Sequence, residues 1–258
     1  MSAPSSLPAI PFRCCLLVPT FNNPMTVRNV VEEARRHLVD VVVVDDGSAE
    51  PGRRACEGLA RDGLAHVVHR ERNGGKGAAV KTGFAEARRL GFTHVLQVDA
   101  DGQHDLSAMP EFLARGRENP RAVVLGYPHY DASAPTVRKV ARRFTRFWVD
   151  LEAGAGVIRD SMIGFRLYPL AAVEQVQAAG NRMDFDIEIA VRLAWTGAPI
   201  LNLPVQVRYL QAQEGGISHF QLLRDNLRFA WLHSKLCTHL CTHWCLRKLG
   251  LVRPRLTA

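Results

Sequence analysis

The sequence lacks a long apolar run. Although 47% of its 258 residues are hydrophobic, no stretch approaches the roughly 18 consecutive apolar residues that cross a bilayer as a helix. The first residues, MSAPSSLPAIPFR, have no basic segment followed by an apolar one, which is the pattern of a secretory signal. We therefore expect a cytoplasmic protein in which residues 1–13 form a mobile lead-in to one large domain.

The sequence also lacks the paired Cys-x-x-Cys clusters typical of structural zinc sites. Without a secretory signal, its six cysteines are expected to be reduced. Cys237, Cys241 and Cys245 recur every four residues and would share one face of a helix. His239 and His243 lie in the same stretch, so a zinc site there is an alternative, which the spacing disfavours.

Acidic residues are outnumbered. Lys and Arg total 33 against 25 Asp and Glu, a net charge of +8, which suggests a polyanionic surface or ligand such as nucleic acid, anionic lipid or phosphate. The excess is concentrated in residues 138–146 and 247–255. No motif of a nucleic-acid-binding fold accompanies it, so we expect no nucleic acid partner.

Repeats and low-complexity tracts are missing too, and the sequence instead alternates short apolar runs with helical patterns. The runs are continuous and rich in β-branched residues, as in strands buried on both faces; they cover residues 14–19, 39–45, 65–69, 94–99 and 122–126. Between them, apolar residues recur at helical spacing. The alternation predicts an α/β fold, with a mostly parallel sheet sandwiched between helices.

Polar segments follow four successive predicted strands. They read VPTFNNP, DDGSAEP, RERNGGKG and DADGQHD. Ligands bind beyond the carboxyl ends of the strands in such sheets, and all four segments would converge on that edge. The pattern predicts a binding site there.

Two carboxylates in the fourth segment suggest a metal site. Asp99 and Asp101 would repel each other unless a cation lies between them, and hard divalent ions prefer oxygen ligands. Gly102 allows a sharp turn after them. The alternative is an ordinary turn with solvated carboxylates, but the position among three other polar strand ends favours the metal.

The second and third segments carry groups suited to a nucleotide. Asp45 and Asp46 can accept hydrogen bonds from a base or ribose, although a plain turn is the alternative. The glycine-rich residues 72–84 lead into a helix whose exposed amides attract anions, and Lys76 adds a point charge. Here the alternative is a flexible loop with a solvated lysine.

Six segments resemble those of inverting family-2 glycosyltransferases of GT-A fold, in the same order. The nearest likeness is to the polyprenyl-phosphate (dolichyl-phosphate) mannosyltransferase-like group. The segments are LLVPTFNN, VVVVDDGS, RNGGKGAAVKTGF, LQVDADGQHD, SMIGFRLYP and MDFDIEIAVRLAWTG. The resemblance spans residues 14–220 and implies a Rossmann-like GT-A domain, a UDP- or GDP-sugar donor and a divalent metal, Mg2+ or Mn2+.

The resemblance also implies roles for individual residues. Those expected to bind the donor are Pro19, Thr20, Asn22, Asp45, Asp46, Asn73, Lys76 and Asp99. Those expected to bind the metal are Asp99, Asp101 and Gln103, which makes Asp101 part of the catalytic machinery. His219 stands where these enzymes commonly have lysine, and it could be a further metal ligand or a phosphate contact. The metal would neutralise charge on the departing diphosphate. Arg208 and Ser218 would contact the acceptor or a phosphate.

The acids of residues 182–195 have two interpretations. The resemblance favours an acid facing the acceptor, with Asp186 as the catalytic base if the acceptor is a hydroxyl. A lipid phosphate is already a nucleophile and needs no base. In the alternative, Phe185, Ile189 and Leu193 pack inward while the acids are solvated.

Two basic amphipathic segments would face an anionic membrane. Residues 136–151 have an apolar stripe formed by Val137, Val140, Ala141, Phe144, Trp148 and Leu151. Together with a basic helical tail at 221–258, this helix can lie at a lipid surface. The alternatives are a core-packed helix with a solvated basic face and a C-terminal helix that closes the core.

Taken with the resemblance, these patterns predict an inverting, metal-dependent transferase that acts on a lipid-type acceptor. The acceptor would be a polyprenyl phosphate or a hydroxylated lipid, met peripherally at the cytoplasmic face of the membrane. A nucleotide-sugar-binding protein without transferase activity is the main alternative. It would keep the donor site but be indifferent to the loss of Asp186 and of the basic helix.

Overall fold

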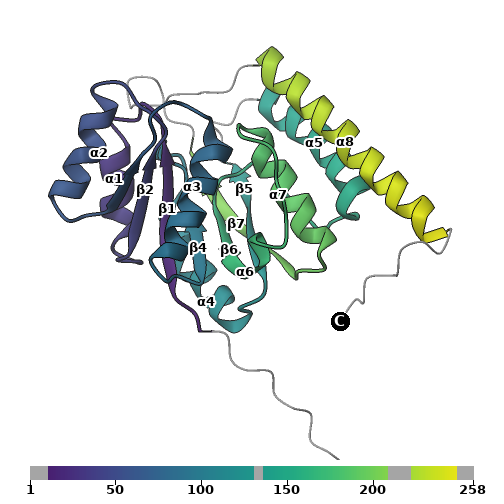
Figure 1. The fold of residues 1–258 in the computed structure, drawn as a ribbon, viewed down its shortest axis with the longest axis horizontal. Helices are drawn as coiled ribbons and strands as arrows, with labels where there is room; N and C mark the ends of the chain where they lie inside the picture. The colour runs from purple at the N-terminus through teal and green to yellow at the C-terminus, as the bar shows by residue number, and fades with distance from the viewer. Residues whose placement is uncertain (1–10, 131–135, 209–221, 249–258) are drawn as a thin grey trace, which may run out of the picture.

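Seven strands form one sheet through the middle of the molecule (Figure 1). The computed structural model describes residues 11–130, 136–208 and 222–248. The order of strands across the sheet is β3-β2-β1-β4-β6-β5-β7. The strands are β1 (Cys14–Thr20), β2 (Val41–Asp45), β3 (His66–His69), β4 (His94–Gln97), β5 (Val123–Tyr130), β6 (Arg166–Pro169) and β7 (Ile200–Val207).

The sheet is mostly parallel, as predicted. Only β6 runs antiparallel to its neighbours β4 and β5 among the described strands. The predicted apolar runs correspond to β1 to β5, whereas β6 and β7 were not predicted. β6 is short and begins with an arginine, and β7 contains Pro204, which a strand tolerates at the edge of a sheet, where β7 lies.

The helices connect the strands in the order expected of an α/β fold. They are α1 (Val27–Ala34), α2 (Gly52–Arg61), α3 (Lys76–Arg89), α4 (Met109–Glu118), α5 (Thr136–Ala153), α6 (Leu170–Val173), α7 (Asp184–Trp195) and α8 (Leu222–Lys248), with a short 3-10 helix at Leu106–Ala108.

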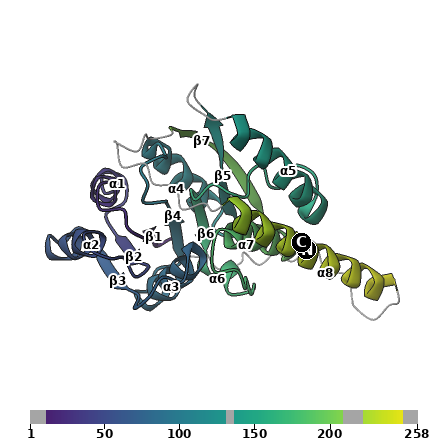
Figure 2. The same cartoon turned by 90° about the horizontal axis from the view of Figure 1, so that it is seen from above.

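Two hydrophobic clusters, one on each face of the sheet, make up the core. Alternate residues of β1 point to opposite faces, so that Leu16 packs with α1, α2 and α4, while Leu17 packs with α3 and α7. Figure 2 shows α1 and α4 on one side of the sheet and α3 on the other. The result is the three-layer sandwich that the sequence predicts.

The last helix is part of this fold. Phe229, Leu232 and Leu236 of α8 are buried in the cluster that also contains α7 and Val149 of α5. In Figure 1, α8 lies alongside α5. Within the described residues, none of the helices has the length and apolar character needed to span a membrane.

Candidate functional site

The polar strand ends meet at one edge of the sheet, as predicted. β1 and β2 end side by side at Thr20 and Asp45, which are register partners. The chain leaves β4 at Gln97 and reaches Asp99 two residues later. These ends place the candidate donor and metal residues around one site.

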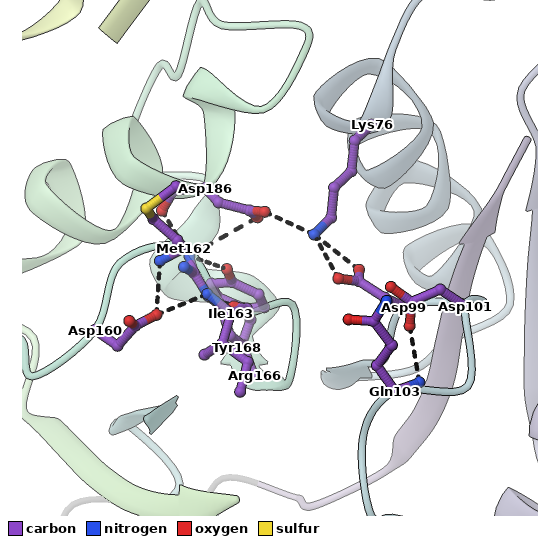
Figure 3. A network of polar contacts seen from close by, with 10 residues as sticks. All are labelled: Lys76, Asp99, Asp101, Gln103, Asp160, Met162, Ile163, Arg166, Tyr168 and Asp186. Atoms are coloured by element: carbon purple, nitrogen blue, oxygen red, sulfur yellow. Dashed lines mark hydrogen bonds and ion pairs between the residues drawn. The ribbon is translucent and has the colours of Figure 1, made fainter. Parts of the chain in front are cut away.

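Lys76 forms the centre of the site (Figure 3). Its Nζ lies 2.8 Å from Oδ1 of Asp99 and 2.8 Å from Oδ2 of Asp186. The lysine opens α3, Asp99 follows β4, and Asp186 lies in the first turn of α7. Three elements that are distant in the sequence thus meet through one ammonium group, and the alternative of a solvated lysine is wrong.

Burial and charge act against each other on these groups. Burial lowers the pKa of Lys76, but the carboxylates of Asp186 and Asp99 more than offset this and hold the pKa above its ordinary value. Burial likewise raises the pKa of Asp99, and Lys76 and His104 reverse this, so that the pKa is lowered overall. At neutral pH the cluster therefore holds an ammonium between carboxylates.

Nearby positive charges stabilise the carboxylate of Asp101 less than that of Asp99. Its Oδ1 accepts a hydrogen bond of 3.0 Å from the backbone N–H of Gln103, in a turn where Gly102 has a positive φ of 72°. Burial raises the pKa of Asp101, His104 counteracts this, and Asp99 adds to the rise. A half-buried carboxylate beside another carboxylate is a place where a cation would be stabilising.

Gly164 leaves room for the Asp99 side chain. A Cβ atom at Gly164 would overlap the Asp99 carboxylate. The turn before β6 therefore lies directly against the metal-binding candidate. The segment SMIGFRLYP contributes to the site through this turn as well as through β6.

A buried arginine lies behind Asp186. Nη1 of Arg166 donates to the backbone oxygen of Asp186 at 2.6 Å and to the hydroxyl of Tyr168 at 3.2 Å. Its Nε donates to the backbone oxygen of Ile163 at 2.7 Å. The role of Arg166 was not predicted, although a charged residue inside an apolar segment was a signal available in the sequence.

The predicted acids of the second strand end are buried and bonded within the protein. Asp45 accepts from the N–H of Ser48 at 2.9 Å and pairs with Nδ1 of His69 at 2.8 Å. Asp46 pairs with Arg70 and accepts from the N–H of Gly75 at 2.7 Å. Both acids therefore organise the loops around the site, and direct contact with a donor stays a prediction.

The first loop is fixed to the second in the same way. Asn22 has a positive φ of 54°; its N–H donates to Ser48 at 2.8 Å and its side chain accepts from the N–H of Ala49 at 2.9 Å. Pro19 and Thr20 are buried in β1. These three residues lie at the predicted edge, and their contact with the base stays a prediction.

Asn73 connects the glycine-rich loop to the start of α7. Its side-chain oxygen accepts from Arg182 at 3.3 Å. Nearby, the N–H of Ala78 donates to the backbone oxygen of Asn181 at 3.0 Å, and a Cβ at Gly77 would overlap Phe185. This close packing fixes Lys76 relative to Asp186.

The acids of α7 are not solvated, so that alternative is wrong for Asp186 and Glu188. The two side chains are buried. Glu188 accepts from the N–H of Gly180 at 2.7 Å and pairs with Arg192 at 2.8 Å, which is a structural role. Phe185 and Ile189 pack inward as expected.

The last predicted site residues are only partly described. The N–H of Arg208 donates to the backbone oxygen of Gln103 at 3.0 Å, which brings the end of β7 to the turn that carries Asp101. Ser218 and His219 lie outside the described residues, so their roles stay predictions.

A basic hollow of about 290 Å³ lies between β5, α5 and residues 158–162. Four arginines line it, Arg142, Arg143, Arg146 and Arg159, and Asp160 is the one acid among its described lining residues. Arg142 pairs with Asp160. The positive charges outnumber this acid, so the hollow is suited to an anion.

The apolar side chains of α5 are not all in the core. Phe144 and Leu151, predicted on the apolar stripe, are exposed, as is Phe147, while Thr145 and Val149 are buried. The core-packed alternative is therefore wrong for Phe144 and Leu151. Leu227 and Trp231 of α8 are exposed as well. We call these five exposed residues, Phe144, Phe147, Leu151, Leu227 and Trp231, the apolar ridge.

Cys237 and His239 of α8 contact different partners. Sγ of Cys237 lies 3.8 Å from Oε1 of Glu152, whereas His239 stacks on Trp195 with ring centroids 5.1 Å apart. Across the part of the chain that the structure describes, no three His, Cys, Asp or Glu side chains form a group able to hold a metal. The described part of α8 therefore gives no support to the zinc alternative.

Comparisons with known proteins agree with this geometry. The family model of glycosyl transferase family 2 matches residues 15–186. The polyprenol monophosphomannose synthase of Mycolicibacterium smegmatis is 28% identical over 210 residues, covering 75% of this chain and 76% of that protein. The undecaprenyl-phosphate mannosyltransferase of Micrococcus luteus is 27% identical over 208 residues, covering 75% and 82%.

A solved structure shares the fold. Glucosyl-3-phosphoglycerate synthase from Mycobacterium tuberculosis, crystallised with UDP, aligns with a TM-score of 0.65 over 88% of this chain and 80% of that one. The same enzyme with Mn2+, UDP and glucosyl-3-phosphoglycerate aligns with a TM-score of 0.62 over 94% and 81%. The identities are 16% and 17%, so the likeness concerns the fold.

Proposed function

The chain belongs to glycosyl transferase family 2, and from that premise we propose that it moves a sugar from a nucleoside-diphosphate donor to a lipid phosphate, with inversion at the anomeric carbon and with a divalent metal. The observation that carries this is the cluster in which Lys76 joins Asp99 and Asp186 beside the half-buried Asp101. It supplies both signs of charge where a sugar diphosphate would be bound and released.

The residues of the Asp99 turn fit a divalent metal. Asp101 is a half-buried carboxylate whose one described hydrogen bond comes from a backbone N–H. It lies next to a second carboxylate, so a cation would relieve an unfavourable charge. Asp99 and Asp101 would hold Mg2+ or Mn2+, with Gln103 as a further oxygen ligand. The bound ion would neutralise charge on the departing diphosphate.

The protein's own groups would orient the reaction. An oxygen of the acceptor forms a bond to the anomeric carbon while the bond from that carbon to the diphosphate oxygen breaks and its electron pair leaves with the nucleoside diphosphate. Lys76 would hold the diphosphate as a point charge. The opposite face of the sugar stays open to the acceptor, which gives inversion.

The state of Asp186 favours a phosphate acceptor over a hydroxyl. Oδ2 of Asp186 is already held by the ammonium of Lys76 at 2.8 Å, so this oxygen is not free to take a proton from a hydroxyl. A phosphate monoester is already nucleophilic and needs no base. We therefore interpret Asp186 as a charge partner of Lys76 rather than as a base.

The basic hollow and the apolar ridge support a lipid as the carrier of that phosphate. Four arginines around one hollow suit a phosphate group, and the apolar ridge on α5 and α8 suits a lipid surface. The named relatives act on polyprenol and undecaprenyl phosphates. We propose that the protein binds the inner face of the cytoplasmic membrane peripherally.

The test is a binding measurement followed by a transfer assay. Calorimetry with UDP- and GDP-sugars, with and without Mn2+, is expected to show metal-dependent binding of one donor by the wild type and none by Asp101→Asn. That donor is then offered with a polyprenyl phosphate and with the corresponding polyprenol. Transfer to the phosphate alone is the expected result, and transfer to the alcohol would make Asp186 a base after all.

A further inference from the structure

Arg166 carries a charge that the proposed transfer does not use. It is the first residue of β6, between β4 and β5 in the sheet, and its side chain is completely buried. Taking a guanidinium out of water is unfavourable unless a negative group compensates it. Among the described residues, Asp186 is the one carboxylate within ion-pair distance of Arg166. Asp160 and Asp99 act on its charge from farther away.

That pair is incomplete. Nη1 of Arg166 lies 3.9 Å from Oδ1 of Asp186, which is too long for a hydrogen bond. In the described chain, Oδ1 of Asp186 and Nη2 of Arg166 are both buried without a hydrogen-bond partner, as are both amide atoms of Gln97. Gln97 is the register partner of Arg166 across β4 and β6. Buried polar groups without partners are rare in proteins, and here they lie together.

The second positive charge beside Asp186 belongs to Lys76, which the donor would attract. Asp186 faces Lys76 from α3 and Arg166 and Tyr168 from β6, with Asp99 on the far side of the lysine (Figure 3). A diphosphate bound on the Asp99 side of the lysine would attract the ammonium. This attraction would draw Lys76 away from Asp186.

We propose that Arg166 is a positioning residue and the reserve counter-ion of Asp186, which pairs with Arg166 when the donor draws Lys76 away. The inference rests on the proposed function, because the donor diphosphate causes the exchange. A rotation of the carboxylate that brings Oδ1 of Asp186 onto the guanidinium would give this oxygen a donor, and Nη2 of Arg166 is the nitrogen that has no partner to give up. Asp186 would then keep a cationic partner and stay fixed in position.

The wild-type protein tests this without relying on a variant of Arg166. NMR of 15N-arginine-labelled protein is recorded before and after saturation with UDP or GDP and Mg2+, with saturation verified by calorimetry. We expect rotation of the Arg166 guanidinium to slow by about fivefold or more as a charge-assisted bond forms. Asp186→Asn is expected to abolish that response. An unchanged signal in the saturated wild type overturns the proposal.

A second variant separates this inference from the proposed function. In Lys76→Met, Asp186 loses its ammonium without any nucleotide, so the Arg166 signal is expected to show the slowed state in the free protein. If calorimetry shows no nucleotide binding, the proposed function fails, yet this variant still reports on the exchange. If nucleotide binds but neither experiment changes the Arg166 signal, Arg166 is a structural support for the Asp186 backbone only.

Discussion

Gly164 faces the carboxylate of Asp99 so closely that a Cβ atom at position 164 would overlap it. The turn before β6 thereby lies directly against the carboxylate of the metal-binding candidate. This packing requires a glycine, since the neighbour that would have to move is the carboxylate proposed to bind the metal.

Gly164→Ala is expected to weaken metal-dependent donor binding by about tenfold or more, since the added methyl group must displace Asp99 and misplaced ligands lose affinity. Calorimetry with Mn2+ and the donor measures this. Gly58→Ala is the matched control, because position 58 lies in α2 and a Cβ there meets only the mobile end of Arg28 at 3.3 Å. Equal donor affinity in both variants would contradict the assignment of Asp99.

Lys76→Met is expected to lower the free energy of unfolding by about 3 kcal/mol, because removing one partner leaves buried carboxylates without compensation. Arg166 beside Asp186 keeps the loss at the low end of that range. Urea unfolding measures it. Lys81→Met is the control: Nζ of Lys81 bonds the backbone oxygens of Ala178 and Gly180 at 3.2 and 3.0 Å, and we expect a loss of about 1 kcal/mol. Equal losses would argue against a charge cluster at Lys76.

The sequence predicted the first five strands and the edge at which their polar ends meet. Continuous β-branched runs leave little choice but a buried strand, and parallel strands bring their carboxyl ends to one edge. For this reason the sequence alone could predict that Asp45, Asp99 and Lys76 lie at one edge of the sheet. β6 and β7 escaped prediction because Arg166 and Pro204 interrupt patterns that otherwise signal a strand.

The partners of the site residues could not be read from the sequence. The bond between Lys76 and Asp186 depends on how α3 packs against α7, and neither helix pattern specifies that contact. The burial of Asp186 and Glu188 has the same cause, because acids at helical spacing look solvated until their neighbours are known. The arginine hollow likewise joins α5 to residues 158–162, a contact made only in the folded chain.

Glu86 gives the protein a stability that depends on pH. Arg89 lowers the pKa of Glu86 to about 2, with burial opposing and His66 adding to the effect. A lowered folded-state pKa means that the stabilisation is full above the unfolded value and is lost as the pH falls from about 4.3 toward 2. Because Arg89 and His66 are more than one-third exposed, solvent screening reduces the contribution to about 1 kcal/mol.

Glu86→Gln is therefore expected to be about 1 kcal/mol less stable than the wild type at pH 7, with the difference vanishing near pH 2. Urea unfolding across this pH range measures the difference. Glu57→Gln removes an exposed pair with Arg53 and is expected to change stability by about 0.5 kcal/mol or less. A pH-independent difference for Glu86→Gln would mean that its packing, not its charge, stabilises the fold.

The apolar ridge predicts binding to anionic lipid. Phe144 and Phe147 are 67% and 63% exposed, so replacing both by serine removes apolar area from the surface without opening a cavity. Sedimentation with phosphatidylglycerol vesicles is expected to show about tenfold or weaker binding for the double variant, with an unchanged melting temperature. High salt is expected to weaken wild-type binding as well, because the neighbouring arginines are screened.

Met25→Ser with Val39→Ser is the matched control for the ridge. These side chains are 63% and 62% exposed but lie beside α1, away from α5 and α8, so the same loss of apolar area is expected to leave vesicle binding unchanged. If both double variants lost vesicle binding equally, the loss would reflect surface hydrophobicity in general and not the apolar ridge. If the wild type bound neutral and anionic vesicles equally well, the arginines would have no role in membrane binding. The aromatic side chains would then account for all of it.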